Sequence, residues 1–325
     1  MVPDASGEAS RETAPRALPP GAKALPDFLF RTSAAVAAST VIVLLGGIFL
    51  ELCINARLSI ARFGFSFFTR DVWNPVTEDF GALSSIYGTI VSSGLAMLLA
   101  VPLSMAIALF LVELAPPLLS RVVGDAIELL AAIPSIIYGI WGLFILSPLI
   151  ADHVQPWIQE TFGEIPLFSG PPMGIGMMTS GIILGFMILP YICAVTRDVL
   201  KMVPPVLKES AYGMGATTWE VTRNVSIPYG LRGIIGAVFL GLGRALGETM
   251  AVTFVIGNDH TLSTSLFAAG TTISATLANE FSEATTPMYL SSLVELGLAL
   301  MAISVVFQAA AYFWMSRLGR VTARA

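Results

Sequence analysis

Charged residues are scarce in this sequence. Only 12% of its 325 residues are Asp, Glu, Lys or Arg, whereas 55% are hydrophobic. A soluble globular domain carries roughly twice that share of charge, about 25%. The composition therefore excludes an ordinary soluble domain and indicates a polytopic membrane protein.

Cysteine and histidine are also rare. Cys53 and Cys193 both lie in apolar runs, so we expect free thiols packed among helices, not a disulfide. The only histidines, His153 and His260, cannot form a metal cluster, and neither His-Glu-x-x-His nor Gly-x-Ser-x-Gly occurs. No lysine follows a glycine, so there is no phosphate-binding P-loop. We expect no catalytic residue, no metal and no cofactor, and any ATP chemistry must come from a partner.

Long apolar runs are abundant, and six of them are long enough to cross a membrane. The first runs from 32 to 54, after a tail over 1–31 that is rich in Pro, Ala and Ser and predicted to be disordered. An outer loop over 55–85 follows. The remaining five runs form a core over 86–315, before a short tail over 316–325, and they cover residues 86–112, 122–150, 174–196, 231–257 and 288–315. The expected fold is all-α with six transmembrane helices.

Basic residues predict the orientation. Six spans place both termini on one side, and that side carries most of the Lys and Arg residues, above all in the inner loop over 197–230. The positive-inside rule then places both termini in the cytoplasm. Three arginines in the first outer loop, Arg57, Arg62 and Arg70, run against the trend without reversing it.

The inner loop contains a predicted helix over 206–222, bounded by Pro204-Pro205 and Pro228. On one helix Ala211, Gly215 and Trp219 would share an apolar face. Such a helix could lie on the bilayer, fill a groove of a cytosolic protein or serve as a plain amphipathic connector.

A finer pattern in this loop favours the groove. Glu209-Ser210-Ala211, three residues, Gly215, nine residues and then Val225-Ser226-Ile227-Pro228 resembles the EAA motif of importer-type ABC permeases. Ser210 replaces the usual second-position alanine. The resemblance implies a coupling helix that docks on an ATPase subunit, with Glu209, Ala211 and Gly215 as contact residues.

Further segments resemble permease subunits of phosphate-specific ABC importers, within the binding-protein-dependent type I ABC permease family. The segments are Trp73-Asn-Pro, Phe80-Gly-Ala-Leu, Ile86-Tyr-Gly-Thr, the run 133–142 (Ile-Pro-Ser-Ile-Ile-Tyr-Gly-Ile-Trp-Gly) and the run 243–252 (Gly-Arg-Ala-Leu-Gly-Glu-Thr-Met-Ala-Val). The resemblance covers about residues 65–315. It implies a bacterial inner-membrane importer of inorganic phosphate. It also implies a homologous second permease as heterodimer partner, an ATPase dimer and a periplasmic phosphate-binding protein.

Two charges interrupt the fifth run. Arg244 and Glu248 are four residues apart, and on a straight helix over 231–257 they would meet near mid-membrane. Each charge costs about 2.5–3.5 kcal/mol at the centre of a membrane helix, which indicates a function. Glycines at 241, 243 and 247 would let another helix or a solute approach, and Ala237, Gly241, Ala251 and Val255 would share the face.

We expect this pair to line the translocation path. Arg244 can bind an oxyanion through two parallel hydrogen bonds and then exchange to Glu248 when the anion leaves. Phosphate, unlike sulfate, can also donate a proton to Glu248. A structural salt bridge remains the alternative for the pair. For the whole chain, a permease for sulfate or molybdate, or a secondary transporter or channel without the ATPase, remain open.

Overall fold

The computed structural model describes residues 24–163 and 165–322. The chain divides into two units, Met1–Glu51 and Leu52–Ala325, which are taken one at a time. Of the tail expected over 1–31, residues 1–23 lie outside the described residues. Helix α1, Ala24–Asn55, already includes the last residues of that expected tail and starts ahead of the expected boundary at Thr32.

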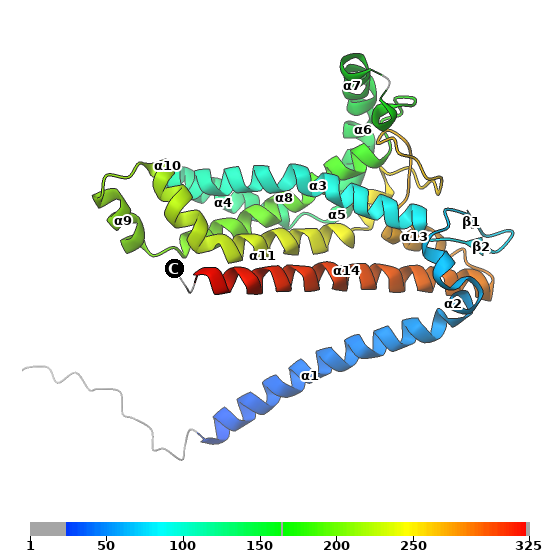
Figure 1. The fold of residues 1–325 in the computed structure, drawn as a ribbon, viewed down its shortest axis with the longest axis horizontal. Helices are drawn as coiled ribbons and strands as arrows, with labels where there is room; N and C mark the ends of the chain where they lie inside the picture. Colours follow the sequence, from blue (N-terminus) through cyan, green and yellow to red (C-terminus); the bar gives the residue numbers. More distant parts are fainter. Residues whose placement is uncertain (1–23, 164, 323–325) are drawn as a thin grey trace, which may run out of the picture. The chain divides into compact units, whose positions relative to one another are not determined.

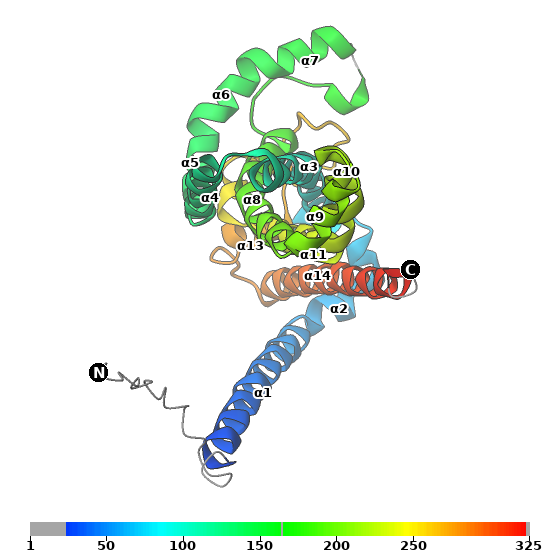
Figure 2. The same ribbon diagram turned by 90° about the vertical axis from the view of Figure 1, so that its left-hand side faces the viewer.

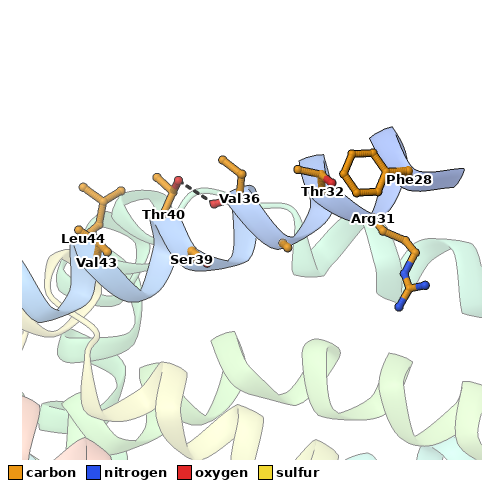
Figure 3. Close-up of a pocket in the computed structure, with 9 residues that line it drawn as sticks. Phe28, Arg31, Thr32, Val36, Ser39, Thr40, Val43 and Leu44 are labelled. Carbon is orange, nitrogen blue, oxygen red and sulfur yellow. Dashed lines mark hydrogen bonds between the residues drawn. The ribbon is translucent and has the colours of Figure 1, made fainter. Parts of the chain in front are cut away.

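The first unit consists, in its described part, of α1 as far as Glu51. This helix is apolar around its whole circumference, as a membrane span is. Two of its hydroxyl groups bond within the helix: Thr40 donates to the Val36 carbonyl at 2.8 Å (Figure 3), and Ser33 donates to the Phe30 carbonyl at 2.9 Å. These internal bonds let a polar side chain stand in an apolar environment without an unpaired donor.

The second unit is largely helical. Its described strands, β1 (Trp73–Asn74) and β2 (Asp79–Phe80), form a short antiparallel pair with Trp73 opposite Phe80. Its helices in chain order are α2 (Arg57–Phe63), α3 (Leu83–Leu109), α4 (Pro117–Ala131), α5 (Ser135–Trp141), α6 (Ser147–Leu149), α7 (Gln155–Phe162), α8 (Met177–Lys201), α9 (Pro205–Gly213), α10 (Thr218–Val221), α11 (Ile227–Leu246), α12 (Met250–Thr253), α13 (Ile273–Glu280) and α14 (Pro287–Thr322). Short 3-10 turns cover Gly64–Phe68 and Pro166–Phe168.

Four π-helical turns lengthen the helices of the described chain. They are η2 (Phe110–Leu114), η3 (Gly142–Leu146), η4 (Ile150–Val154) and η6 (Thr222–Ser226). Of these, η2 extends α3, and η3, η4 and η6 join neighbouring helices. With them, six segments of the described chain are long and apolar enough to cross a membrane: Phe28–Asn55, Leu83–Leu114, Ser135–Phe162, Met177–Lys201, Thr218–Leu246 and Pro287–Arg317. The number of spans agrees with the sequence-based expectation, and the all-helical fold is confirmed.

The third span differs from its prediction over 122–150. The apolar run there belongs to two helices, because α4 ends at Ala131 and Pro134 precedes α5 in an extended conformation, with ψ of 138°. A residue before proline is kept out of the helical region, so the chain turns there. Pro134 therefore ends a helix, whereas Pro102 and Pro190 lie within α3 and α8.

Helix α8 forms the centre of the second unit. In the most apolar stretch of this helix, 67% of the residues are buried, and the helix packs along α3, α4 and α11. Glycine permits the closest approach, since a Cβ at Gly181 would lie 2.6 Å from Leu95 of α3. Cys193 is buried in this core, and both it and Cys53 are free thiols, as expected.

The two ends of this bundle differ in character. Helices α3, α8, α11 and α14 run alongside one another, with α9 and α10 at one end (Figures 1 and 2). The β1–β2 hairpin and α13 lie at the opposite end, and α14 leads from there back to the end that carries α9 (Figure 1). Any movement of α9 would therefore have to travel the length of the bundle to reach the hairpin end.

Candidate functional site

The fifth span is broken where the sequence carries its two charges. Helix α11 ends at Leu246, Gly247 caps it, and α12 begins at Met250. The straight helix expected over 231–257 is therefore wrong. Glu248 lies in the gap between the two helices, so its position relative to Arg244 is not that of neighbours on one helical face.

Arg244 stands in the last turn of α11 with an exposed side chain. A positive charge there is stabilised by the partial negative charge of the helix C-terminus. Its guanidinium carbon lies 5.8 Å from the centre of the Tyr191 ring on α8, a cation–π distance. Arg244 and Glu248, both within the described chain, form no ion pair at 4.0 Å or less. The guanidinium is thus free to meet an anion.

Glu248 has a different partner. One of its carboxylate oxygens accepts a hydrogen bond from the backbone N–H of Ala251 at 3.2 Å, which satisfies a donor at the start of α12. The side chain is half-buried. Each of the two charges is therefore stabilised by a different helix end, in place of the mutual pairing that the sequence suggested.

The break also divides the face predicted around the pair. Ala237 and Gly241 are buried against the core, where a Cβ at Gly241 would lie 2.6 Å from Ile192 of α8. Ala251 and Val255 are fully buried as well. Ala251 and Val255 lie beyond the break, so they no longer share a helix with Arg244. The small residues pack the bundle, whereas the Arg244 side chain is exposed.

The predicted coupling segment is two helices, where the sequence reading expected one. Helix α9 ends at Gly213, and Gly215 follows with a φ of +87°. The Ala216 amide bonds to the Ala211 carbonyl at 3.2 Å, and the Gly215 amide bonds to the Tyr212 carbonyl at 2.9 Å. These two bonds and a glycine in the left-handed region make a Schellman cap.

This cap gives a physical reason for the motif's spacing. In a Schellman cap the left-handed residue follows the accepting carbonyl by four positions, as Gly215 follows Ala211. Ala211 is buried with 7% exposure, whereas Glu209 points to the exposed side. The expected sharing of one face by Ala211, Gly215 and Trp219 does not occur.

The next helix starts with a capping box that sequence reading missed. The Thr217 hydroxyl accepts from the Glu220 amide at 3.3 Å, and the Glu220 carboxylate accepts from the Thr217 amide at 2.8 Å. The signal was present as Thr-x-x-Glu two residues after Gly215. Helix α10 then continues through η6 into α11 without a break.

An apolar surface is exposed around this turn. Met214, the most exposed of its members, is 84% accessible, and the others are Met202, Val206 and Trp219. Large apolar side chains exposed on the loop end of a membrane bundle are candidates for contact with another protein. We name these four residues the turn surface.

A hydrogen-bonded cluster holds the opposite end of the bundle. Glu280 of α13 accepts from Trp73 Nε1 and from the Tyr289 hydroxyl, both at 2.6 Å, and bonds His260 Nε2 at 2.7 Å. Burial alone would raise the pKa of the Glu280 carboxyl, but these hydrogen bonds and the His260 charge outweigh it and bring the pKa below the ordinary 4.5. The cluster joins the hairpin, the loop before α13 and the start of α14. Sequence reading did not find it.

The described residues hold no group of three or more His, Cys, Asp and Glu side chains placed to bind a metal ion. What they do hold is six candidate membrane spans, a break in the fifth span beside an exposed arginine, and an exposed helical turn at one end of the second unit. Together these features define a multi-pass membrane transport protein.

The chain belongs to the family of binding-protein-dependent transport system inner membrane components, whose model matches residues 100–320. It is 58% identical over 299 residues to the phosphate transport system permease protein PstC of Mesorhizobium japonicum, covering 91% of each chain. It is 53% identical to the protein of the same name from Pasteurella multocida, over 86% of this chain and 88% of that one.

Solved structures share the fold at lower identity. A chain of the bacterial alginate ABC transporter, in complex with its alginate-bound periplasmic protein, matches with a TM-score of 0.59 and 17% identity, over 90% of this chain and 97% of that chain. The fold is therefore that of an ABC importer permease. The protein is the permease component of such a transporter, and its ATPase is a separate subunit.

Proposed function

We propose that this chain is the permease subunit of an ATP-driven importer of inorganic phosphate. Two relatives at 58% and 53% identity that carry the name of a phosphate transport permease support the choice of solute. Sulfate and molybdate are the competing oxyanions, because an arginine alone can bind any of the three.

The proposed location is the bacterial inner membrane with both termini in the cytoplasm. The end of the bundle with α9 carries the basic inner loop 197–230, and α14 returns to the same end (Figure 1). An excess of Lys and Arg marks the cytoplasmic side. The segment 55–85 would then be periplasmic, the tails 1–31 and 316–325 cytoplasmic, and 86–315 the permease core anchored by the first span over 32–54.

The observation that carries the proposed path is the outward arginine at the helix break. A guanidinium without a carboxylate partner at membrane depth is costly unless an anion or a second protein surface meets it. Arg244 has the fork geometry for two hydrogen bonds to phosphate and keeps its charge at any working pH. We place Arg244 in the translocation path, where it faces the homologous second permease across the dimer.

Glu248 acts as the internal partner in this proposal. In the present conformation it binds the Ala251 amide, so pairing with Arg244 requires that bond to break. The exchange of Arg244 between phosphate and Glu248 would thereby couple departure of the anion to a change at α12. A protonated phosphate could also donate to Glu248, which sulfate cannot do.

The turn surface is the proposed contact with an ATPase dimer. Glu209 is exposed beside it, while Ala211 and Gly215 shape the turn that presents it. A periplasmic phosphate-binding protein would deliver the solute at the opposite end of the bundle. The main alternative is a secondary transporter or channel, which would need no ATPase and would not need this surface.

Phosphate uptake by variants of Arg244 tests the path. At equal membrane levels, Arg244→Lys should retain more uptake than Arg244→Gln, because it keeps the charge. The matched control is Arg232→Gln, which removes an exposed arginine from the start of the same helix and should leave uptake near that of the wild type. Equal uptake in all three variants would remove Arg244 from the path.

A second variant addresses the carboxylate. Glu248→Gln removes the charge but keeps an oxygen that can accept from Ala251, so the helix break should persist. We expect lower uptake and weaker discrimination against sulfate. Wild-type rate together with wild-type selectivity would exclude a role for the Glu248 charge.

A further inference from the structure

Side chains from three separate segments, one of them α9, meet at a single carboxylate oxygen. Lys208 Nζ donates to Glu113 Oε1 at 2.7 Å, and the Ser226 hydroxyl donates to the same oxygen at 2.8 Å. The Glu113 side chain is 6% exposed and that of Lys208 is 19% exposed. We name these three residues the Glu113 link.

The backbone around the link is unusual. Glu113 lies on the π-helical turn η2, where the second span ends, and Ser226 lies on the π-helical turn η6, directly before α11. Such turns are rare and occur mostly at functional sites, because they redirect a side chain that a regular helix would point elsewhere. Here one such turn supplies the carboxylate of Glu113, and the other supplies the Ser226 hydroxyl that donates to it.

The link is the side-chain bridge from α9 to the bundle. Within the described residues, the only other hydrogen bond of an α9 side chain joins Ser210 to the Val206 carbonyl inside the same helix. The chain also holds α9 at its two ends, at α8 through Pro204 and at α10 through the cap at Gly215, and α9 packs against η6 with Ala211 buried. The Glu113 link adds a charged hydrogen bond to this packing and so fixes the orientation of α9 on the bundle.

Resting on the proposed function, we infer that Lys208 and Glu113 are positioning residues that transmit movement of α9 to two spans at once. Glu113 belongs to the span of α3, and its second donor, Ser226, opens α11. Helix α11 has 20 residues, so it is about 30 Å long and carries any displacement to Arg244 at its far end. A charged pair this well buried resists separation, because one charge without the other would be left unpaired away from water.

The test uses the complete importer, reconstituted with its ATPase and binding protein. Lys208→Met and Glu113→Gln are measured singly and together, against Lys201→Met as control. Lys201 is exposed at the end of α8 and forms no ion pair within 4.0 Å in the described chain. The readouts are phosphate moved per ATP hydrolysed and hydrogen exchange of the α9 amides.

We expect the single variants to lower phosphate moved per ATP by about tenfold, the shift that loss of one charge-assisted hydrogen bond permits. The α9 amides should exchange faster. The double variant leaves no unpaired charge, so it should assemble normally and still show both effects. The exchanged pair Lys208→Glu with Glu113→Lys should restore part of the coupling, which a purely structural role of either residue would not predict.

A double variant that matches Lys201→Met in both readouts would overturn the inference, as would a charge exchange that restores nothing. Failure of the proposed function looks different. A wild-type complex that hydrolyses ATP but moves no phosphate contradicts phosphate import, while the exchange rates of α9 still support or overturn the link.

Discussion

Gly215→Ala is the substitution whose effect follows most directly from the backbone. At φ of +87° an L-residue with a side chain is strained whatever space surrounds it, and a Cβ at this position would meet nothing within 4 Å. The cost is therefore that of the left-handed conformation alone, about 1–2 kcal/mol. A change of that size shifts the population of the native turn by about 5–30-fold.

Gly213→Ala provides the matched control. It adds the same methyl group two residues earlier, at the last position of α9, again with nothing within 4 Å and without a positive φ. Replacing a helical glycine by alanine should leave stability unchanged or raise it by up to about 0.5–1 kcal/mol. Gly215→Asn should fall between the two, because asparagine enters the left-handed region more readily than alanine.

Hydrogen exchange at positions 215 and 216 measures the turn itself. Their amides bond the carbonyls of Tyr212 and Ala211, so opening of the cap exposes them. In Gly215→Ala their protection should fall by about 5–30-fold, and ATP-driven uptake should fall with it. Equal protection in the two alanine variants would refute the role given to the Schellman cap.

Two further predictions concern the rest of the bundle. A Cβ at Gly88 of α3 would lie 1.9 Å from the Thr271 carbonyl oxygen, so Gly88→Ala should destabilise the protein by about 1–3 kcal/mol in denaturant titrations. A Cβ at Gly94 of the same helix would meet nothing within 4 Å, so Gly94→Ala should not destabilise the protein. Equal destabilisation by the two substitutions would show that the close contact at Gly88 is not the cause. The lowered pKa of Glu280 stabilises the fold at pH values above its ordinary 4.5, and this contribution is lost as the pH falls through the folded-state pKa. The melting temperature in detergent should therefore fall as the pH is lowered, and it should fall less steeply in Glu280→Gln than in the wild type. Parallel curves of melting temperature against pH would contradict this.

The number and type of the spans could be predicted because length and apolar composition are local properties. The third span shows the limit of that reasoning. Residues 122–150 read as one apolar run, yet the helix ends at Ala131, and the actual span gains its length from the turns η3 and η4, which reach polar residues such as Asp152. Apolarity alone does not mark a chain reversal inside a hydrophobic run.

In the candidate sites, too, the sequence shows the residue types, whereas their arrangement depends on packing. The charges at Arg244 and Glu248 stood out in the sequence, but the break between them depends on packing, since no proline marks it and Ser274 of α13 reaches the Leu246 carbonyl only in the folded bundle. The turn at Gly215 and the capping box that follows at Thr217 could have been found from the pattern Gly-x-Thr-x-x-Glu. The Glu113 link could not, because its members are far apart in the chain.

ATP-driven uptake by the reconstituted importer, with phosphate, sulfate and molybdate offered in turn, is the decisive test of the proposed function. We expect uptake of phosphate that requires ATP and the binding protein, with little uptake of the other two anions. Transport that persists without ATP, or that proceeds equally with sulfate, would contradict it.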